Sequence, residues 1–278
     1  MITDTTADLT DELINRYNIK VLPFRIIYKD REYRDGIDIK PQQVYDRLKY
    51  EIPTSSMPSM QDMEEVYNKL EEEGYTHAIA VTLSTGLSGI FNGITVVSKN
   101  HPKIKSFICD SQTISWGEGV LVKCCAELIE DGKSFEEIVS TIPSIKDRIH
   151  TFFVVGTLEY LKAGGRIGKV SGTIAELLDI KPIISVSKTD GKYFTYDKVR
   201  GRKKSLNRLV EIGNNFLNNK KGQVYIMSGS AREEAEKIAE AISKNPNAIS
   251  ISYGGDLSPV SGVHSGPGLV GMVIFEEA

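Results

Sequence analysis

Cysteine, histidine and long apolar runs are scarce in this sequence. The 278 residues include three cysteines and four histidines. Cys124 and Cys125 are neighbours that could hardly pair without strain, which leaves Cys109 and predicts a reducing, cytoplasmic location. The first eight residues carry acids and hydroxyls where a signal peptide has basic and apolar residues. No run approaches the ~18 apolar residues that a membrane span needs, so we expect no membrane insertion.

An excess of positive charge is also lacking. The chain has 34 lysines and arginines against 37 aspartates and glutamates, which gives a net charge of −3. A protein that captures nucleic acid through its phosphates usually carries a marked positive charge. The composition therefore indicates no nucleic-acid partner and favours a small, neutral or weakly charged ligand.

No segment matches the pattern of a cofactor or metal site. Residues 164–169 (GGRIGK) loosely resemble a P-loop, but Ala163 and Val170 stand where the first glycine and the magnesium-binding hydroxyl belong. Residues 266–271 (GPGLVG) satisfy G-x-G-x-x-G but leave no room for a following helix and strand. The histidines and cysteines lack the spacing of metal ligands. We therefore expect neither a cofactor nor a metal.

Up to about residue 150, strand patterns alternate with helix patterns. Ser59 precedes one predicted helix, and Ser134 with Glu137 forms a capping box for another. This alternation predicts a mainly parallel, doubly wound, Rossmann-like sheet. The predicted strands are 20–28, 76–83 and 104–109, and the predicted helices begin at Pro41 and span 60–73, 91–98, 116–130 and 135–149.

The pattern changes after residue 150. Asp190-Gly191 predicts a hairpin, because this pair tolerates the positive φ of a tight turn. We therefore predict an α/β protein of two domains, a parallel domain at 1–149 and an α+β domain with a mainly antiparallel sheet at 150–278, with a ligand cleft between them. The predicted strands of the second domain are 151–155, 180–187, 192–196, 223–227 and 269–275, and its helices are 204–218 and 231–243.

Two hydroxyl-rich segments precede predicted helices. Residues 83–89 (LSTGLSG) follow a strand, and residues 53–59 (PTSSMPS) lead into another helix. Unpaired N–H groups at a helix start can bind an anion together with such hydroxyls. One such segment alone is more often a simple helix cap. The two together predict a shared site for a negatively charged group.

Ser88 also suggests an alternative function. A strand, a tight turn, a serine and a helix follow one another as in a hydrolase nucleophile elbow, and His264 is the best base for it. Ile90, however, occupies the place of the last glycine in G-x-S-x-G. A serine hydrolase using Ser88 and His264 is therefore the second hypothesis. A regulatory or structural protein without a ligand is the third.

Eight segments, in order over essentially the whole chain, resemble the DegV family. Each segment alone is modest, and their common register makes the resemblance specific. They are residues 4–9 (DTTADL), 55–59 (SSMPS), 83–89 (LSTGLSG), 110–111 (DS), 117–119 (GEG), 157–162 (TLEYLK), 164–169 (GGRIGK) and 264–268 (HSGPG).

The resemblance implies a bacterial lipid-binding protein that is not itself an enzyme. Such a protein encloses one long-chain fatty acid, of about C14 to C18, between its domains. It presents the carboxylate to a separate ATP-dependent fatty acid kinase, and the acyl phosphate stays bound to the carrier.

The resemblance also implies roles for particular residues. Those expected to hydrogen-bond the carboxylate are Ser55, Ser56, Ser88 and His264. Those expected near the pocket or the phosphate are Thr85, Gly86, Arg166 and Gly266. Those expected to dock the kinase are Arg200, Arg202 and Lys203, with Lys204 beside them. Ser55, Ile90 and Trp116 depart from the family's usual residues, so we expect them to alter the head-group contacts or the shape of the pocket.

Overall fold

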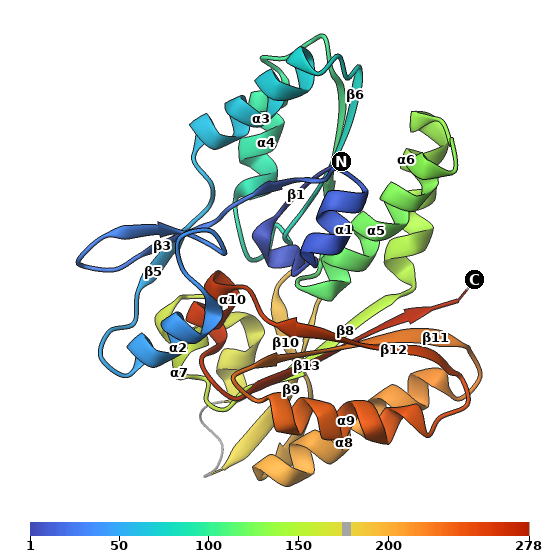
Figure 1. Cartoon of the computed structure of the whole chain (residues 1–278). Coiled ribbons are helices and arrows are strands. Elements are labelled where there is room, and N and C mark those ends of the chain that lie inside the picture. The colour runs from blue at the N-terminus through green and yellow to red at the C-terminus, as the bar shows by residue number, and fades with distance from the viewer. Residues whose placement is uncertain (174–178, 278) are drawn as a thin grey trace.

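Three β-sheets organise the chain in the computed structural model, which describes residues 1–173 and 179–277 (Figure 1). The first sheet is parallel and has the order β2-β1-β6-β7. Helices α3 and α4 lie on one side of it, and α1, α5 and α6 lie on the other (Figure 1). The predicted Rossmann-like sheet is therefore confirmed. Its elements are β1 (Ile2–Asp4), α1 (Asp11–Arg16), β2 (Lys20–Leu22), α3 (Met60–Glu72), β6 (His77–Thr82), α4 (Ile90–Ser98), β7 (Lys105–Asp110), α5 (Trp116–Glu130) and α6 (Phe135–Asp147).

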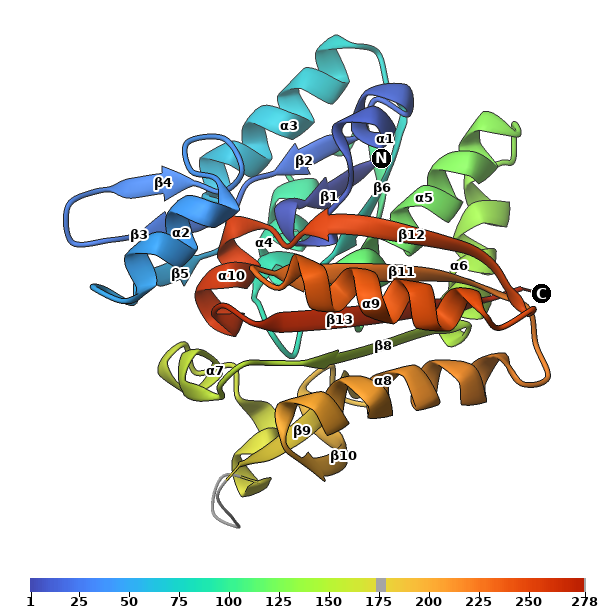
Figure 2. The same cartoon turned by 60° about the horizontal axis from the view of Figure 1, so that its bottom comes forward.

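The second sheet has six strands in the order β10-β9-β8-β13-β11-β12. Its pairs are antiparallel except for β11 with β12, which confirms a mainly antiparallel sheet. Helices α8 and α9 cover one face (Figure 2). Its elements are β8 (Ile149–Val154), β9 (Ile180–Val186), β10 (Tyr193–Arg200), α8 (Arg202–Leu217), β11 (Gly222–Gly229), α9 (Arg232–Ser243), β12 (Ala248–Asp256) and β13 (Leu269–Glu276).

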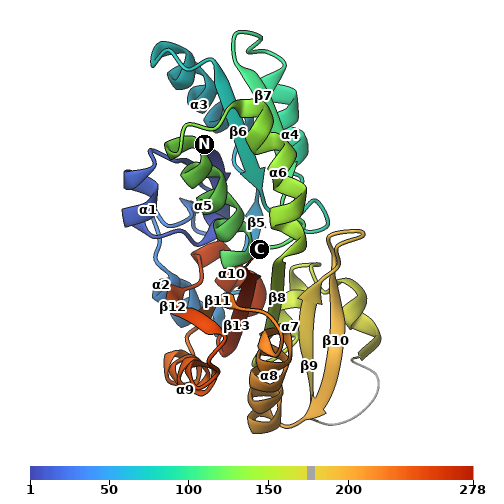
Figure 3. The same ribbon diagram turned by 90° about the vertical axis from the view of Figure 1, so that its right-hand side faces the viewer.

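The central strands of this second sheet are buried on both faces. Successive side chains of a strand point to opposite sides, so Phe152 packs in the core beneath α8 and α9. Phe153 points the other way, into the larger core that the sheet shares with the first half of the chain. In β13 every residue is buried, as its continuous apolar run requires. The six-stranded sheet is therefore a middle layer of the molecule, as the side view shows (Figure 3).

The third sheet was not expected from the sequence. It has three short antiparallel strands in the order β4-β3-β5 and projects beside α2 (Figure 1). The prediction of one strand over 20–28 is wrong: Pro23, which has no N–H to donate, separates β2 in the parallel sheet from β3 in this one. The elements here are β3 (Arg25–Ile27), β4 (Glu32–Arg34), α2 (Pro41–Leu48) and β5 (Thr54–Ser56).

Local capping signals placed several helices correctly. Ser59 caps α3 and Ser134 caps α6, each in a capping box. The predicted hairpin is present as β9 and β10, with Gly191 at φ +66°. Helix α6 ends at Asp147 and not at residue 149, because Ile149 already pairs in β8. The short elements η1 (Thr5–Ala7), α7 (Glu159–Ala163), η2 (Gly168–Thr173) and α10 (Pro259–Ser265) complete the chain.

Candidate functional site

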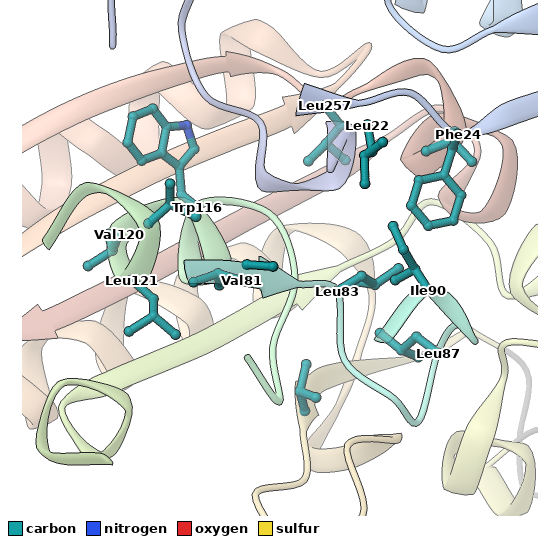
Figure 4. Close-up of a cluster of buried hydrophobic side chains, with 14 of the residues drawn as sticks. Leu22, Phe24, Val81, Leu83, Leu87, Ile90, Trp116, Val120, Leu121 and Leu257 are labelled. Atoms are coloured by element: carbon teal, nitrogen blue, oxygen red, sulfur yellow. The ribbon is translucent and has the colours of Figure 1, made fainter. Parts of the chain in front are cut away.

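A largely apolar cavity lies where the two halves of the sequence meet. The space open to the centre of a water molecule is about 70 Å³, several times the ~10–15 Å³ that one water needs. Apolar side chains on both sides of residue 150 line it, including Phe24, Leu83, Leu87, Tyr193, Leu257 and Leu269. Figure 4 shows Phe24, Leu83 and Leu87 near one another at one end of the buried cluster. The walls suit a narrow apolar group.

Ser55 and His264 bring polar atoms into this apolar wall. Ser55 lies in the middle of β5, and His264 lies in the last turn of α10. Ser55 Oγ is 2.7 Å from His264 Nε2, and both residues line the cavity. The expectation that Ser55 belongs to a helix start is wrong, because residues 54–56 form a strand and only Ser59 caps the helix.

Burial determines the charge of His264. It lowers the pKa of the imidazole to about 4, and the positive charge of Arg166 acts in the same direction. At neutral pH the ring is therefore uncharged and carries a single N–H donor. Its Nδ1 is buried and has no hydrogen-bond partner among the described residues.

Arg166 supplies a cation to the same cavity. Its Nε donates to the carbonyl oxygen of Leu87 at 3.3 Å, and its Nη1 donates to that of Gly164 at 2.7 Å. Nη2 forms no hydrogen bond within the described parts of the chain, and the residue is only partly buried. These two hydrogen bonds hold the guanidinium in place, and Nη2 remains available as a donor to a ligand.

Ser56 and Ser88 do not line this cavity. The Ser56 hydroxyl is exposed and donates to the carbonyl oxygen of Met57 at 3.3 Å. The Ser88 hydroxyl accepts from the N–H of Ile90, the first residue of α4, also at 3.3 Å. Ser88 therefore precedes the N-cap residue Gly89 and binds the first N–H of the helix, and His264 bonds to Ser55 instead of Ser88. The serine that the hydrolase hypothesis needs is not hydrogen-bonded to its base.

Thr85 and Gly86 have structural contacts of their own. The Thr85 hydroxyl and N–H both donate to the carboxylate of Asp110. A Cβ on Gly86 would lie 2.3 Å from the backbone of Gly191, so the loop needs glycine where the β9–β10 hairpin packs on it. Ser84 fixes the same contact by donating to the Gly191 carbonyl at 2.8 Å.

Gly266 fixes the backbone beside His264. Its φ of +66° and ψ of −178° are essentially restricted to glycine, and a Cβ there would lie 2.0 Å from the ring of Tyr160. A Cβ on Gly164 would likewise lie 2.1 Å from His264 Nδ1. Two of the predicted glycine motifs therefore serve close packing around the histidine.

Buried carboxyl groups adjoin the cavity wall, and no sequence pattern predicted them. Thr6 lines the cavity and donates to Asp4, while Glu118 lies within 3.1 Å of the same hydroxyl. Burial raises the pKa of Asp4, and burial together with the Asp4 charge raises that of Glu118 well above its ordinary value. Burial therefore disfavours the charged form of both carboxyl groups.

Trp116 lies outside the cavity lining. Its ring stacks on Tyr225 with centroids 4.7 Å apart, and its Nε1 donates to the Gly254 carbonyl at 3.2 Å. A Cβ on Gly254 would lie 2.1 Å from Nε1. Trp116 therefore packs α5 against β11 and β12. These contacts do not support the expectation that Trp116 shapes the pocket.

The basic segment lies at the start of α8. Arg200, Lys203 and Lys204 are exposed, while Arg202 forms an ion pair with Glu234 of α9. One nitrogen of Arg202, Nη1, is buried without a hydrogen-bond partner among the described residues. None of these four residues lines the cavity.

Two absences hold for residues 1–173 and 179–277. No helix in these ranges is both long enough and apolar enough to cross a membrane. No group of three or more histidine, cysteine or acidic side chains in the same ranges is placed to hold a metal ion.

Comparison with known proteins identifies the family. A family model described as "Uncharacterised protein, DegV family" matches residues 1–277. The chain belongs to the DegV family. A DegV domain-containing protein of Clostridium acetobutylicum is 58% identical over 100% of this chain and 98% of its own.

Solved DegV structures share the fold. A fatty-acid-binding DegV family protein from Thermus thermophilus has a TM-score of 0.92 at 25% identity, covering 99% of this chain and 98% of its own. A stearic-acid-binding protein from Eubacterium ventriosum has a TM-score of 0.89 at 27% identity, covering 99% and 97%. The DegV resemblance expected from the sequence is confirmed.

Proposed function

We propose that this protein encloses one long-chain fatty acid, of about C14 to C18, in the cavity between its halves. The observation that carries the proposal is the polar group formed by Ser55, His264 and Arg166 in a largely apolar wall. Fatty-acid binding by DegV proteins of matching fold supports it. The ligand suited to this arrangement has one anionic end and a long apolar body.

The tail supplies the affinity. Burial of each CH₂ is worth roughly 0.8 kcal/mol, so a C16 chain gains on the order of 12 kcal/mol before the costs of binding. Because the cavity is narrow, we expect apolar side chains such as Leu87 and Leu257 to shift when the tail enters.

The polar group orients the head. A carboxylate at this end of the cavity can accept from the Ser55 hydroxyl, from Nε2–H of neutral His264 and from the unused Nη2 of Arg166. Charge-assisted hydrogen bonds of this kind contribute about 1.5–3 kcal/mol each. The sequence also predicted Ser56 and Ser88 as head-group contacts. Both lie outside the cavity lining, where Ser56 donates to Met57 and Ser88 accepts from Ile90, so we assign the head group to Ser55, His264 and Arg166.

We further propose that the bound carboxylate is presented to a fatty acid kinase, and that this chain catalyses no reaction itself. Arg202, Lys203 and Lys204 occupy the first turn of α8, which contains no acidic residue of its own, and Arg202 pairs with Glu234 of α9. Cations at a helix N-terminus oppose its macrodipole, so local helix stability does not account for them. An acidic or phosphate-bearing partner would account for these cations.

Mass spectrometry of a solvent extract of the purified protein tests the binding proposal. We expect C14 to C18 fatty acids in a stoichiometric amount, because the buried tail makes dissociation slow. The protein should be extracted in parallel after unfolding and washing, which controls for lipid adsorbed to the surface. Preparations that stay empty after supplementation with stearate would contradict the proposal.

A further inference from the structure

A second cleft lies beside the cavity and shares its wall at Thr151 and Phe152. The space open to water centres is about 430 Å³, far larger than in the first cavity. One side is the loop that follows β7, at the carboxyl edge of the parallel sheet, and the other is the β9–β10 hairpin. Ligands of open α/β sheets characteristically bind at this edge.

The lining is positively charged. Lys146, Lys169 and Lys188 contribute to it, and none of the lining residues that the structure describes is acidic. Lys169 forms an ion pair with Asp190, but Lys146 and Lys188 donate to backbone carbonyl oxygens and form no ion pair among the described residues. On a chain with a net charge of −3, this cleft concentrates positive charge.

Aromatic rings form one wall. Phe216 packs against His150 with ring centroids 4.4 Å apart, and against Phe152 at 5.4 Å. Phe152 in turn meets Tyr196 edge-on at 4.9 Å. Tyr196 is 44% exposed, so part of this wall faces solvent without a protein neighbour. Such a wall offers a stacking surface for a flat ring.

His150 also lines this cleft. Its Nε2 is buried and forms no hydrogen bond with the described residues, although Glu276 lies 3.4 Å away. Burial lowers the pKa of Lys188. The charges of Asp147 and Glu276, which lie outside the lining, act in the opposite direction.

We propose that this cleft binds a small organic anion with a flat aromatic ring. The ring stacks on the wall of Tyr196 and Phe216, and the anionic group lies toward Lys146 and Lys188. These four residues line this cleft and not the neighbouring cavity, so binding of the anion should be independent of the fatty acid.

The test titrates 8-anilinonaphthalene-1-sulfonate into protein saturated with stearate and measures binding by the fluorescence of the probe. We expect saturable binding, and Lys188→Glu should weaken it about ten-fold. Lys192→Glu is the matched control, because Lys192 is exposed in the same hairpin and does not line the cleft. Tyr196→Ala should weaken binding about five-fold through loss of the ring contact.

A second ligand separates charge from ring binding. N-phenyl-1-naphthylamine lacks the sulfonate, so its affinity should be lower and unaffected by Lys188→Glu. Methanesulfonate, which lacks the rings, should not displace the probe at equal concentration. Equal affinity of the Lys188→Glu and Lys192→Glu proteins, displacement by excess stearate, or absence of saturable binding would each overturn the proposal.

Discussion

Ser55 and His264 are 209 positions apart in the sequence and 2.7 Å apart in the structure. The histidine is held by a short helix against Gly164, and the serine by the central part of a three-residue strand. A serine bonded to a histidine resembles part of a catalytic triad, but the third member is missing. Nδ1, which an acid would orient in a triad, has no partner among the described residues.

We therefore expect no esterase activity from this pair. A histidine whose pKa burial lowers to about 4 is a weak base for activating a hydroxyl. Hydrolysis of p-nitrophenyl butyrate by the wild type should not exceed that of the Ser55→Ala, Ser88→Ala and His264→Gln proteins. Turnover that disappears in one of the serine variants and in His264→Gln would restore the hydrolase hypothesis.

Neighbouring serines provide a matched test of head-group binding. Ser55→Ala should weaken stearate binding about ten-fold or more, because it removes a charge-assisted hydrogen bond worth ~1.5–3 kcal/mol. Ser56→Ala removes an exposed hydroxyl outside the cavity lining and should leave the affinity unchanged. Displacement of a fluorescent fatty acid measures both. Equal losses of stearate affinity in the two variants would indicate that the carboxylate does not bind beside His264.

The buried imidazole predicts a pH dependence of stability. His264 has a pKa of about 4 when folded and about 6.5 when unfolded, so the unfolded state binds more protons between these values. Stability is therefore lost as pH falls through this window. Between pH 7 and pH 5 the loss from this group should be roughly 2 kcal/mol for the pKa of about 4.

Urea unfolding of the wild type and His264→Gln at both pH values isolates that contribution. The other titrating groups are common to both proteins. Between pH 7 and pH 5 the free energy of unfolding of His264→Gln should therefore fall by roughly 2 kcal/mol less than that of the wild type. Parallel pH profiles would show that the imidazole is not buried as described.

Gly266 predicts a steric cost next to the site. Gly266→Ala should destabilise the protein by ~3 kcal/mol or more, because it combines a disfavoured backbone conformation with a clash against Tyr160. Gly165→Ala is the control: its φ is +70°, but open space surrounds the position of a Cβ, so about 1 kcal/mol is expected. Thermal unfolding compares the two. Similar shifts would mean that Tyr160 moves aside easily.

Much of the fold followed from local signals. The capping boxes at Ser59 and Ser134 and the turn at Gly191 act over a few residues, so the sequence shows them directly. Strand β12 was missed because its residues are mostly half-buried or exposed and lack an apolar run. The division at Pro23 was missed because pairing with distant strands decides where each half goes.

The site was harder to predict than the fold. Ser55 and Ser88 lie in similar hydroxyl-rich segments, and nothing local distinguishes them. Only tertiary packing turns Ser55 toward His264 and leaves Ser88 bonded to the N–H of Ile90. The raised pKa values of Asp4 and Glu118 likewise depend on burial, which a sequence shows only for apolar runs.

Arg202 at the start of α8 allows the docking proposal to be tested. Arg202→Ala should leave bound fatty acid unchanged, because Arg202 does not line the cavity, and should slow phosphorylation of that fatty acid by a cognate kinase. The ion pair with Glu234 complicates this substitution, so Glu234→Gln is the matched control: it breaks the pair but keeps the cation available to a partner. We expect Glu234→Gln to be phosphorylated at the wild-type rate or faster. Because an isolated exposed charge contributes little, equal rates for wild type and Arg202→Ala would mean that the segment is only solvated surface. Loss of bound lipid from Arg202→Ala would instead place this arginine at the pocket and contradict the separation of binding from docking.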